Sequence, residues 1–176
     1  MKKLAGFILV LALVLAIAPA SLAEGERIAL ICDPVGNNLF LTQVVEKAEE
    51  LQAKYGYELS LMECSDTDEW QSNYRAAVAE GYDLILGVGR QSAEYANELA
   101  TEYPDAAKYA VIDTDAGSDN VMSISYNEEQ AAYLMGVMAG NAFPDEELYG
   151  YIGCFEGAGS FKYTWGFAEG VRSVNP

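Results

Sequence analysis

The chain of 176 residues carries 27 acidic and 10 basic side chains, has a formal net charge of −17, and contains no histidine. Nucleic acid and anionic membrane surfaces are bound through clustered Lys and Arg, so we expect no nucleic acid or anionic membrane partner. The lack of histidine excludes Ser-His-Asp and Cys-His catalysis and imidazole metal sites from this stretch. Carboxylates remain the main candidates for proton transfer.

The N-terminus has the pattern of a secretory signal peptide. Two lysines precede an uncharged stretch over residues 4–18, and Ser21 and Ala23 occupy the minus-three and minus-one positions of a cleavage site. The stretch is shorter than the ~20 apolar residues usual for a spanning helix, which disfavours the alternative of an uncleaved membrane anchor. We therefore expect an exported protein, periplasmic or at the cell surface, cleaved after Ala23.

Apolar runs alternate with helical patterns over the next part of the chain. The pattern predicts strands over 27–32, 58–63, 84–88 and 109–112, separated by helices over about 38–54, from 66 to Gly81, and over about 92–102. Nearly continuous apolar strands suit a sheet that is buried on both faces, and the helices between them predict right-handed crossovers. The sequence therefore predicts an α/β fold with a doubly wound parallel sheet in the strand order 2-1-3-4.

A polar, turn-rich stretch, 114–120, is expected to close this first lobe. The pattern beyond it predicts a strand over 121–125, a helix over about 127–141, a strand over 148–152 and a helix over about 160–174. We expect residues 24–122 to form the first ligand-binding lobe. Residues 123–176 are expected to form only the beginning of a second lobe, cut short where the chain ends.

The predicted helix over 127–141 has two notable patterns. Its inner face is expected to carry the apolar residues Ala131, Leu134, Met135 and Met138. Gly136 and Gly140 are four residues apart, a spacing that we interpret as close packing against a strand.

Two cysteines, Cys32 and Cys64, fall near the ends of the first two predicted strands, which are neighbours in the predicted sheet. A disulfide between them is one interpretation for an exported protein. Two small buried hydrophobic side chains are the default interpretation.

Polar residues and glycines follow the predicted strands where ligands of open α/β sheets bind, outside the carboxyl ends of the strands. Asp113 follows the fourth strand, and we regard it as the first candidate for ligand contact. Asp33 follows the first strand and either accepts hydrogen bonds from a ligand or caps the next turn. Gly87 and Gly89 end the third strand and allow a ligand to approach the backbone closely.

The start of the first predicted helix offers three more candidates. Asn37 and Asn38 either hydrogen-bond the edge of a heterocycle or a ribose, or cap the helix. Phe40 either stacks on a ligand ring or, given its helical spacing with Val44 and Ala48, packs in the core.

Four runs of sequence, in this order, resemble the basic membrane protein (BMP) family of substrate-binding proteins, which have the type I periplasmic-binding fold. They are GYDLILGVG, ATEYPDAAKYAVID, NVMSISYNEEQAAYLMGVMAG and YGYIGCFEGAGSFKYTWGFAEGVRSVNP. The resemblance covers residues 27–176, about the first half of a family member. It implies an extracytoplasmic binding protein of an ABC transporter that closes two lobes on a small neutral ligand, such as a purine nucleoside, and delivers it to a membrane permease. No catalysis, cofactor or metal is implied.

The family places ligand contacts in the loop after its first strand, where an acidic residue precedes Gly-Gly, Asn and Ser-Phe. The corresponding loop here, Cys32 to Leu41, is one residue shorter, and the Ser-Phe pair falls on Phe40-Leu41. Asp113 matches the family's acidic residue after strand four. Two alternatives remain: a ligand-sensing lobe for a membrane receptor, and a carboxylate-based nucleoside hydrolase, which the scattered acidic residues disfavour.

Overall fold

A computed structural model describes residues 25–153 and 157–176. These residues form two compact units, and the boundary between them in the sequence falls between Ile124 and Ser125. The expected signal peptide and its cleavage site after Ala23 lie outside the described residues. Within the described part of the chain, no helix combines the length and the apolar character that crossing a membrane requires.

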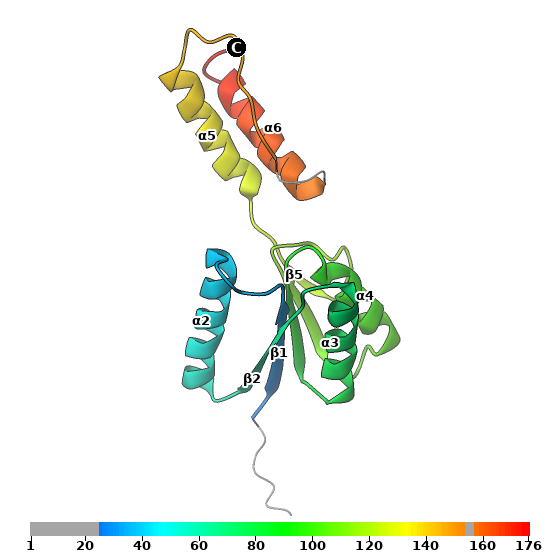
Figure 1. The fold of residues 1–176 in the computed structure, drawn as a ribbon. Helices are drawn as coiled ribbons and strands as arrows, with labels where there is room; N and C mark the ends of the chain where they lie inside the picture. Colours follow the sequence, from blue (N-terminus) through cyan, green and yellow to red (C-terminus); the bar gives the residue numbers. More distant parts are fainter. Residues whose placement is uncertain (1–24, 154–156) are drawn as a thin grey trace, which may run out of the picture. The chain divides into compact units, whose positions relative to one another are not determined.

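The first unit contains a five-stranded parallel sheet (Figure 1). Its strands are β1 (Arg27–Cys32), β2 (Glu58–Glu63), β3 (Leu84–Val88), β4 (Lys108–Ile112) and β5 (Met122–Ile124). They lie in the order β2-β1-β3-β4-β5, and every neighbouring pair is parallel. The predicted order 2-1-3-4 and the α/β parallel-sheet class are confirmed.

The short strand β5 lies elsewhere than expected. Residues from 123 onward are expected in the second lobe, but Ser123 and Ile124 belong to β5, which pairs with β4 in the first sheet, with Met122 beside Ala110 and Ile124 beside Ile112. The turn-rich stretch after β4 carries the chain back to the start of the sheet without a helix, so a parallel fifth strand forms directly.

Helices cover both faces of this sheet. α2 (Leu39–Tyr55) lies on one face, and α3 (Thr67–Ala79) and α4 (Ser92–Glu102) lie on the other (Figure 1). Alternate residues of β1 fill the two cores: Leu30 packs beneath α2, and Ile31 packs beneath α3 and α4. This alternation follows from the two-residue period of a strand.

The two cysteines follow the same alternation. Cys32 packs with Leu30 and Leu41 on the α2 face, and Cys64 packs with Trp70 on the α3 face, where its sulfur accepts a hydrogen bond from Asn73. Both thiols are free and buried. Because they lie on opposite faces of the sheet, the disulfide interpretation is wrong and the buried-hydrophobe interpretation holds.

The second unit is built on α5 (Glu128–Ala142) and α6 (Ala158–Arg172), which pack against each other through glycines. A Cβ atom on Gly136 would lie 2.1 Å from the carbonyl oxygen of Phe167, and one on Gly170 would lie 2.1 Å from that of Tyr133. Close packing at Gly136 was expected, but the partner is a helix rather than a strand.

Two expectations for the second unit are wrong. The residues expected on the inner face of α5 are exposed: Ala131, Leu134, Met135 and Met138. The strand expected over 148–152 does not form, because the described residues of this unit provide no neighbouring strand with which it could pair. Instead, Tyr151 packs against Phe167 of α6, with 6.4 Å between ring centroids.

Candidate ligand-binding site

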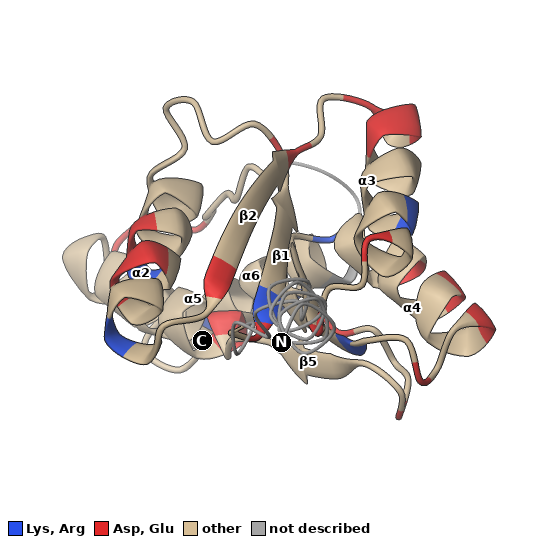
Figure 2. Ribbon diagram, turned by 90° about the horizontal axis from the view of Figure 1, so that it is seen from below, with Lys and Arg blue, Asp and Glu red and all other residues tan. Residues whose placement is uncertain are grey.

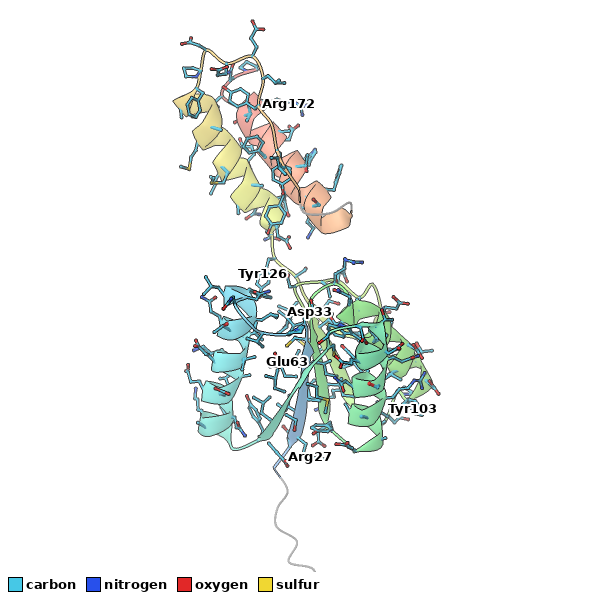
Figure 3. The ribbon with its side chains drawn as sticks, in the orientation of Figure 1. Arg27, Asp33, Glu63, Tyr103, Tyr126 and Arg172 are labelled. Atoms are coloured by element: carbon cyan, nitrogen blue, oxygen red, sulfur yellow. The ribbon has the colours of Figure 1, made fainter. Side chains whose placement is uncertain are left out.

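The strand order reverses the direction of the chain connections at one end of the first sheet. From β1 the chain passes to α2 on one face, whereas from the adjacent β3 it passes to α4 on the other face (Figure 1). Such a reversal separates the two loops that follow the strands and is where open α/β sheets bind ligands. We call the ends of β1, β3 and β4, with the loops that follow them, the carboxyl edge; five of the six candidate residues lie on it, and Phe40 lies in the first turn of α2. Figure 3 shows Asp33 at this end of the sheet and Arg27 at the other.

Two hydrogen bonds fix the loop after β1, one with the side chain of Glu63 and one within the loop itself. The side chain of Glu63, at the end of β2, accepts a hydrogen bond from the backbone N–H of Val35 at 2.6 Å. The N–H of Asn38 donates to the carbonyl of Val35 at 2.9 Å and closes the turn. Asp33 is half-buried at the start of this loop and Asn37 is exposed. Sequence reasoning missed Glu63, although its position as the last residue of the strand beside β1 could have indicated it.

Asn38 is the N-cap of α2. Its Oδ1 accepts hydrogen bonds from the backbone N–H groups of Phe40, at 3.0 Å, and Leu41, at 3.2 Å. This is the capping interpretation of the two considered for Asn38, and it commits the amide oxygen to the helix. A contact of Asn37 or Asn38 with ligand stays a prediction.

Phe40 sits at the margin of the core beneath α2. Its half-buried ring packs against the cluster that contains Leu30, Leu41 and Val88. The structure therefore gives Phe40 a packing role, while part of its surface stays exposed. Stacking on a ligand remains a prediction.

Gly87 in β3 and Gly89 directly after it differ in role. A Cβ atom on Gly87 would lie 2.0 Å from the Tyr74 hydroxyl, so Gly87 is required by packing beneath the edge rather than by a ligand. Gly89 has φ of 91°, a conformation that L side chains rarely adopt, and nothing lies within 4 Å of where its Cβ would be. Its N–H donates to the carbonyl of Ile112 at 2.9 Å, which joins the ends of β3 and β4.

Asp113 follows β4 in the left-handed region, with φ of 64°. Asp is one of the few residues that tolerate this conformation. Its N–H donates to the carbonyl of Ile124 at 2.8 Å, and its side chain is exposed. Asp115 instead accepts a hydrogen bond from the N–H of Gly117 at 2.9 Å, which makes it a turn-forming residue.

The carboxyl edge is acidic. Asp33 and Asp113 lie there, Glu63 ends the neighbouring strand β2, and Arg90 is the basic residue of the loop after β3; Arg27 and Lys108 begin strands at the opposite end. Acidic residues also lie in the first turn of α3 and along α4 (Figure 2). Burial, followed by the charge of Glu63 and smaller effects of Cys64 and Asp33, raises the pKa of Cys32 to about 11. The thiol is therefore protonated at neutral pH and is no nucleophile. Because carboxylates outnumber the single basic side chain, Arg90, the edge favours neutral over anionic ligands.

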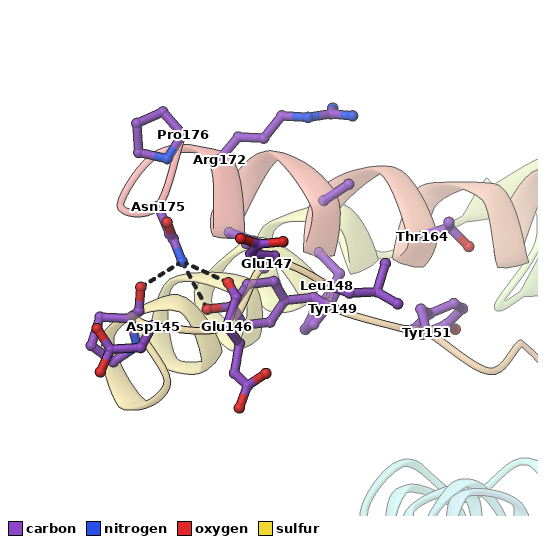
Figure 4. Close-up of a pocket in the computed structure, with 14 residues that line it drawn as sticks. Asp145, Glu146, Glu147, Leu148, Tyr149, Tyr151, Thr164, Arg172, Asn175 and Pro176 are labelled. Atoms are coloured by element: carbon purple, nitrogen blue, oxygen red, sulfur yellow. Dashed lines mark hydrogen bonds between the residues drawn. The ribbon is translucent and has the colours of Figure 1, made fainter.

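The second unit has a hollow of about 680 Å³ between α6 and the segment 144–151 (Figure 4). Asn175 lies at its end and donates to the carbonyl of Pro144 at 3.2 Å and to the Tyr149 hydroxyl at 2.9 Å. None of the six candidate residues lines this hollow. It is therefore separate from the carboxyl edge.

Comparison with known proteins identifies the family. Residues 27–176 match the Bmp family model, described as ABC transporter substrate-binding protein PnrA-like. The chain belongs to this family. A CD4+ T-cell-stimulating antigen of Listeria innocua is 34% identical over 116 residues, which are 66% of this chain and 32% of that protein. The ABC transporter nucleoside-binding protein BmpA of Lactococcus lactis is 25% identical over 126 residues, covering 72% of this chain and 36% of that one.

A solved structure supports the fold. An ABC transporter solute-binding protein from Aeropyrum pernix superposes with a TM-score of 0.70 at 23% identity, over 85% of this chain and 44% of that chain. This Bmp-family chain thus has the fold of periplasmic-type solute-binding proteins. It spans less than half the length of these relatives.

Proposed function

We propose that the protein is an exported solute-binding protein of an ABC transporter that binds a small neutral ligand, such as a purine nucleoside, at the carboxyl edge. The observation that carries the proposal is the reversal of chain direction between β1 and β3, with Asp33, Gly89 and Asp113 at the strand ends beside it. Membership of the Bmp family supports the transporter role. The nucleoside-binding BmpA of L. lactis supports the ligand class.

Five of the six candidate residues contact ligand in the proposal, and Asn38 caps α2. Asp113 and Asp33 accept hydrogen bonds from ribose hydroxyls or base amines, and Asn37 supplies a donor and an acceptor. Phe40 offers the exposed part of its ring for stacking, and Gly89 lets the ligand approach the backbone. The acidic edge repels phosphate, so it selects a nucleoside over a nucleotide.

Binding is proposed to act through closure of two lobes rather than through chemistry. A ligand that contacts both lobes favours the closed form because its free energy of interaction is larger there. The closed form is then the one that a membrane permease accepts. No bond is made or broken in this scheme.

The direct test is mass spectrometry of ligand released from protein purified from its own host. A purine nucleoside in stoichiometric amount is the expected result. A different neutral solute would leave the transporter role standing but reject the nucleoside. Incubation with nucleosides separates the hydrolase alternative, because release of free base would reject a purely binding function.

Export has its own test. The mature chain purified from the host should begin at Glu24, as N-terminal mass analysis would show. A chain that retains residues 1–23 would contradict the signal peptide.

A further inference from the structure

Ser92 stands out among the polar side chains of residues 25–153 and 157–176. Within these ranges, Ser92 is the polar residue that is fully buried, with 0% of its surface exposed to solvent. It is the first residue of α4, but it does not cap that helix: the N-cap is Gln91, which makes no side-chain capping bond. A buried hydroxyl normally has a defined hydrogen-bonding task, because leaving it unpaired is costly.

The Ser92 hydroxyl forms a hydrogen bond with Gly89. The Ser92 Oγ donates to the carbonyl oxygen of Gly89 at 2.5 Å, and the Ser92 N–H donates to the same oxygen at 3.1 Å. From beneath, the hydroxyl of Tyr74 on α3 donates to the carbonyl of Ser92 at 3.3 Å. Hydrogen bonds therefore connect the loop after β3 to α4, and α4 to α3.

Gly87 makes room for this arrangement. A Cβ atom there would lie 2.0 Å from the Tyr74 hydroxyl and 2.5 Å from the Cβ of Ser92. The hydroxyls thus fill the space directly beneath the end of β3. Tyr74 itself is only 1% exposed, and burial raises the pKa of its hydroxyl, which stays protonated and able to donate.

The series of hydrogen bonds continues from Gly89 to the residues around Asp113. Gly89 donates to the carbonyl of Ile112, the residue before Asp113, at 2.9 Å, and Asp113 donates to the carbonyl of Ile124 at 2.8 Å. One series of hydrogen bonds therefore runs from Tyr74 through Ser92 and Gly89 to the end of β4.

We propose that Ser92 and Tyr74 are positioning residues of the ligand site, which hold Gly89 and the adjoining end of β4 in the conformation that binds ligand. This inference rests on the function proposed above. A binding site needs its contacting groups held by a supporting layer, because a loop that must be ordered on binding weakens affinity. Neither residue touches ligand; both act through Gly89.

The chain offers a matched control at the other end of the sheet. Tyr82, which precedes β3, is 4% exposed, and its hydroxyl donates to the Ser60 hydroxyl at 2.8 Å. The variants Ser92→Ala and Tyr74→Phe remove buried hydroxyl groups at the carboxyl edge. Ser60→Ala and Tyr82→Phe remove the same groups away from it. Each pair loses two hydrogen-bonding hydroxyls; because Ser60 is half-buried and Ser92 is fully buried, Ser60→Ala is expected to cost less thermal stability than Ser92→Ala.

Two measurements separate positioning from stability. Hydrogen exchange at the amides of Gly89 and Ser92 should be at least tenfold faster in Ser92→Ala than in Ser60→Ala. Calorimetric titration with guanosine and inosine should show affinity reduced about five- to tenfold in Ser92→Ala and Tyr74→Phe, or about 1–1.4 kcal/mol at 1.4 kcal/mol per decade. Ser60→Ala and Tyr82→Phe should bind like the unaltered protein.

Equal exchange rates in Ser92→Ala and Ser60→Ala would overturn the inference, and so would equal loss of affinity in the two pairs. If the unaltered protein binds neither nucleoside, the proposed ligand fails. The hydrogen-exchange rates of the Gly89 and Ser92 amides still decide whether the Ser92 hydroxyl restrains Gly89.

Discussion

At the scale of single residues, the carboxyl edge combines an unusual backbone with an acidic charge. Among the described residues other than glycine, Asp113 is the one with positive φ, at 64°. Holding a residue there costs on the order of 1 kcal/mol, which the surrounding structure must offset. The hydrogen bond from Asp113 to the carbonyl of Ile124 provides such support. The strained residue and the first candidate for ligand contact are therefore the same residue.

Replacing Asp113 tests this candidate. Asn tolerates the left-handed conformation, so Asp113→Asn removes the charge without the backbone strain that Ala would add. We expect nucleoside affinity to fall by about 1.5 kcal/mol, the lower end for a hydrogen bond to a charged group. Asp115→Asn, in the adjacent turn, is the control and should bind normally. Calorimetry that finds equal affinity in both variants would remove Asp113 from the site.

Cys32 gives a prediction for pH. Its pKa is raised from 9.0 to about 11 in the folded protein, so between these values the unfolded chain loses the proton while the folded chain keeps it. The unfolded state then binds fewer protons, and stability falls as pH rises from 9 to 11. Urea unfolding at pH 8 and pH 10.5 should show a smaller decrease for Cys32→Ala than for the unaltered protein. An identical decrease would mean that other groups cause it.

At the scale of elements, the predictable parts are those that the chain specifies locally. β3 and α4 have the predicted bounds because an apolar run followed by Gly89, and a helical pattern stopped before Pro104, are strong local signals. The role of Ser92 could not be predicted, because it depends on Tyr74 from another helix. The exposed face of α5 was mistaken for its core face: the sequence pattern marks apolar residues, whereas Gly136 and Gly140 make the contact.

A substitution that adds one methyl group tests the glycine contact between α5 and α6. Gly170→Ala would place a Cβ 2.1 Å from the carbonyl oxygen of Tyr133, so the helices must separate. We expect the second unit to lose about 1–3 kcal/mol of stability, the usual cost of overpacking. Gly150→Ala is the control, because nothing lies within 4 Å of that position. Hydrogen exchange in α5 that is equally slow in both variants would contradict the packing.

At the scale of the whole molecule, the two units differ in how well their apolar residues are covered. The sheet of the first unit has helices on both faces. The second unit exposes large apolar side chains, among them Leu134 at 63%, Met138 at 64% and Trp165 at 53%. Apolar surface of this kind promotes association.

We therefore expect a polypeptide of residues 24–176 to self-associate through its second unit. The double variant Leu134→Lys with Met138→Glu should shift light scattering toward the monomer. Leu39→Lys, which removes a single exposed side chain of the first unit, should leave it unchanged. A monodisperse monomer before any substitution would contradict this expectation.

The central claim is that the carboxyl edge binds a neutral nucleoside without transforming it. Calorimetric titration of the protein with guanosine, and then with guanosine 5′-monophosphate, tests this most directly, with chromatography of the recovered ligand. We predict saturable binding of guanosine at one site, recovery of the intact nucleoside, and at least tenfold weaker binding of the phosphate, about 1.4 kcal/mol. Tighter binding of the phosphate, or release of free guanine, would contradict it.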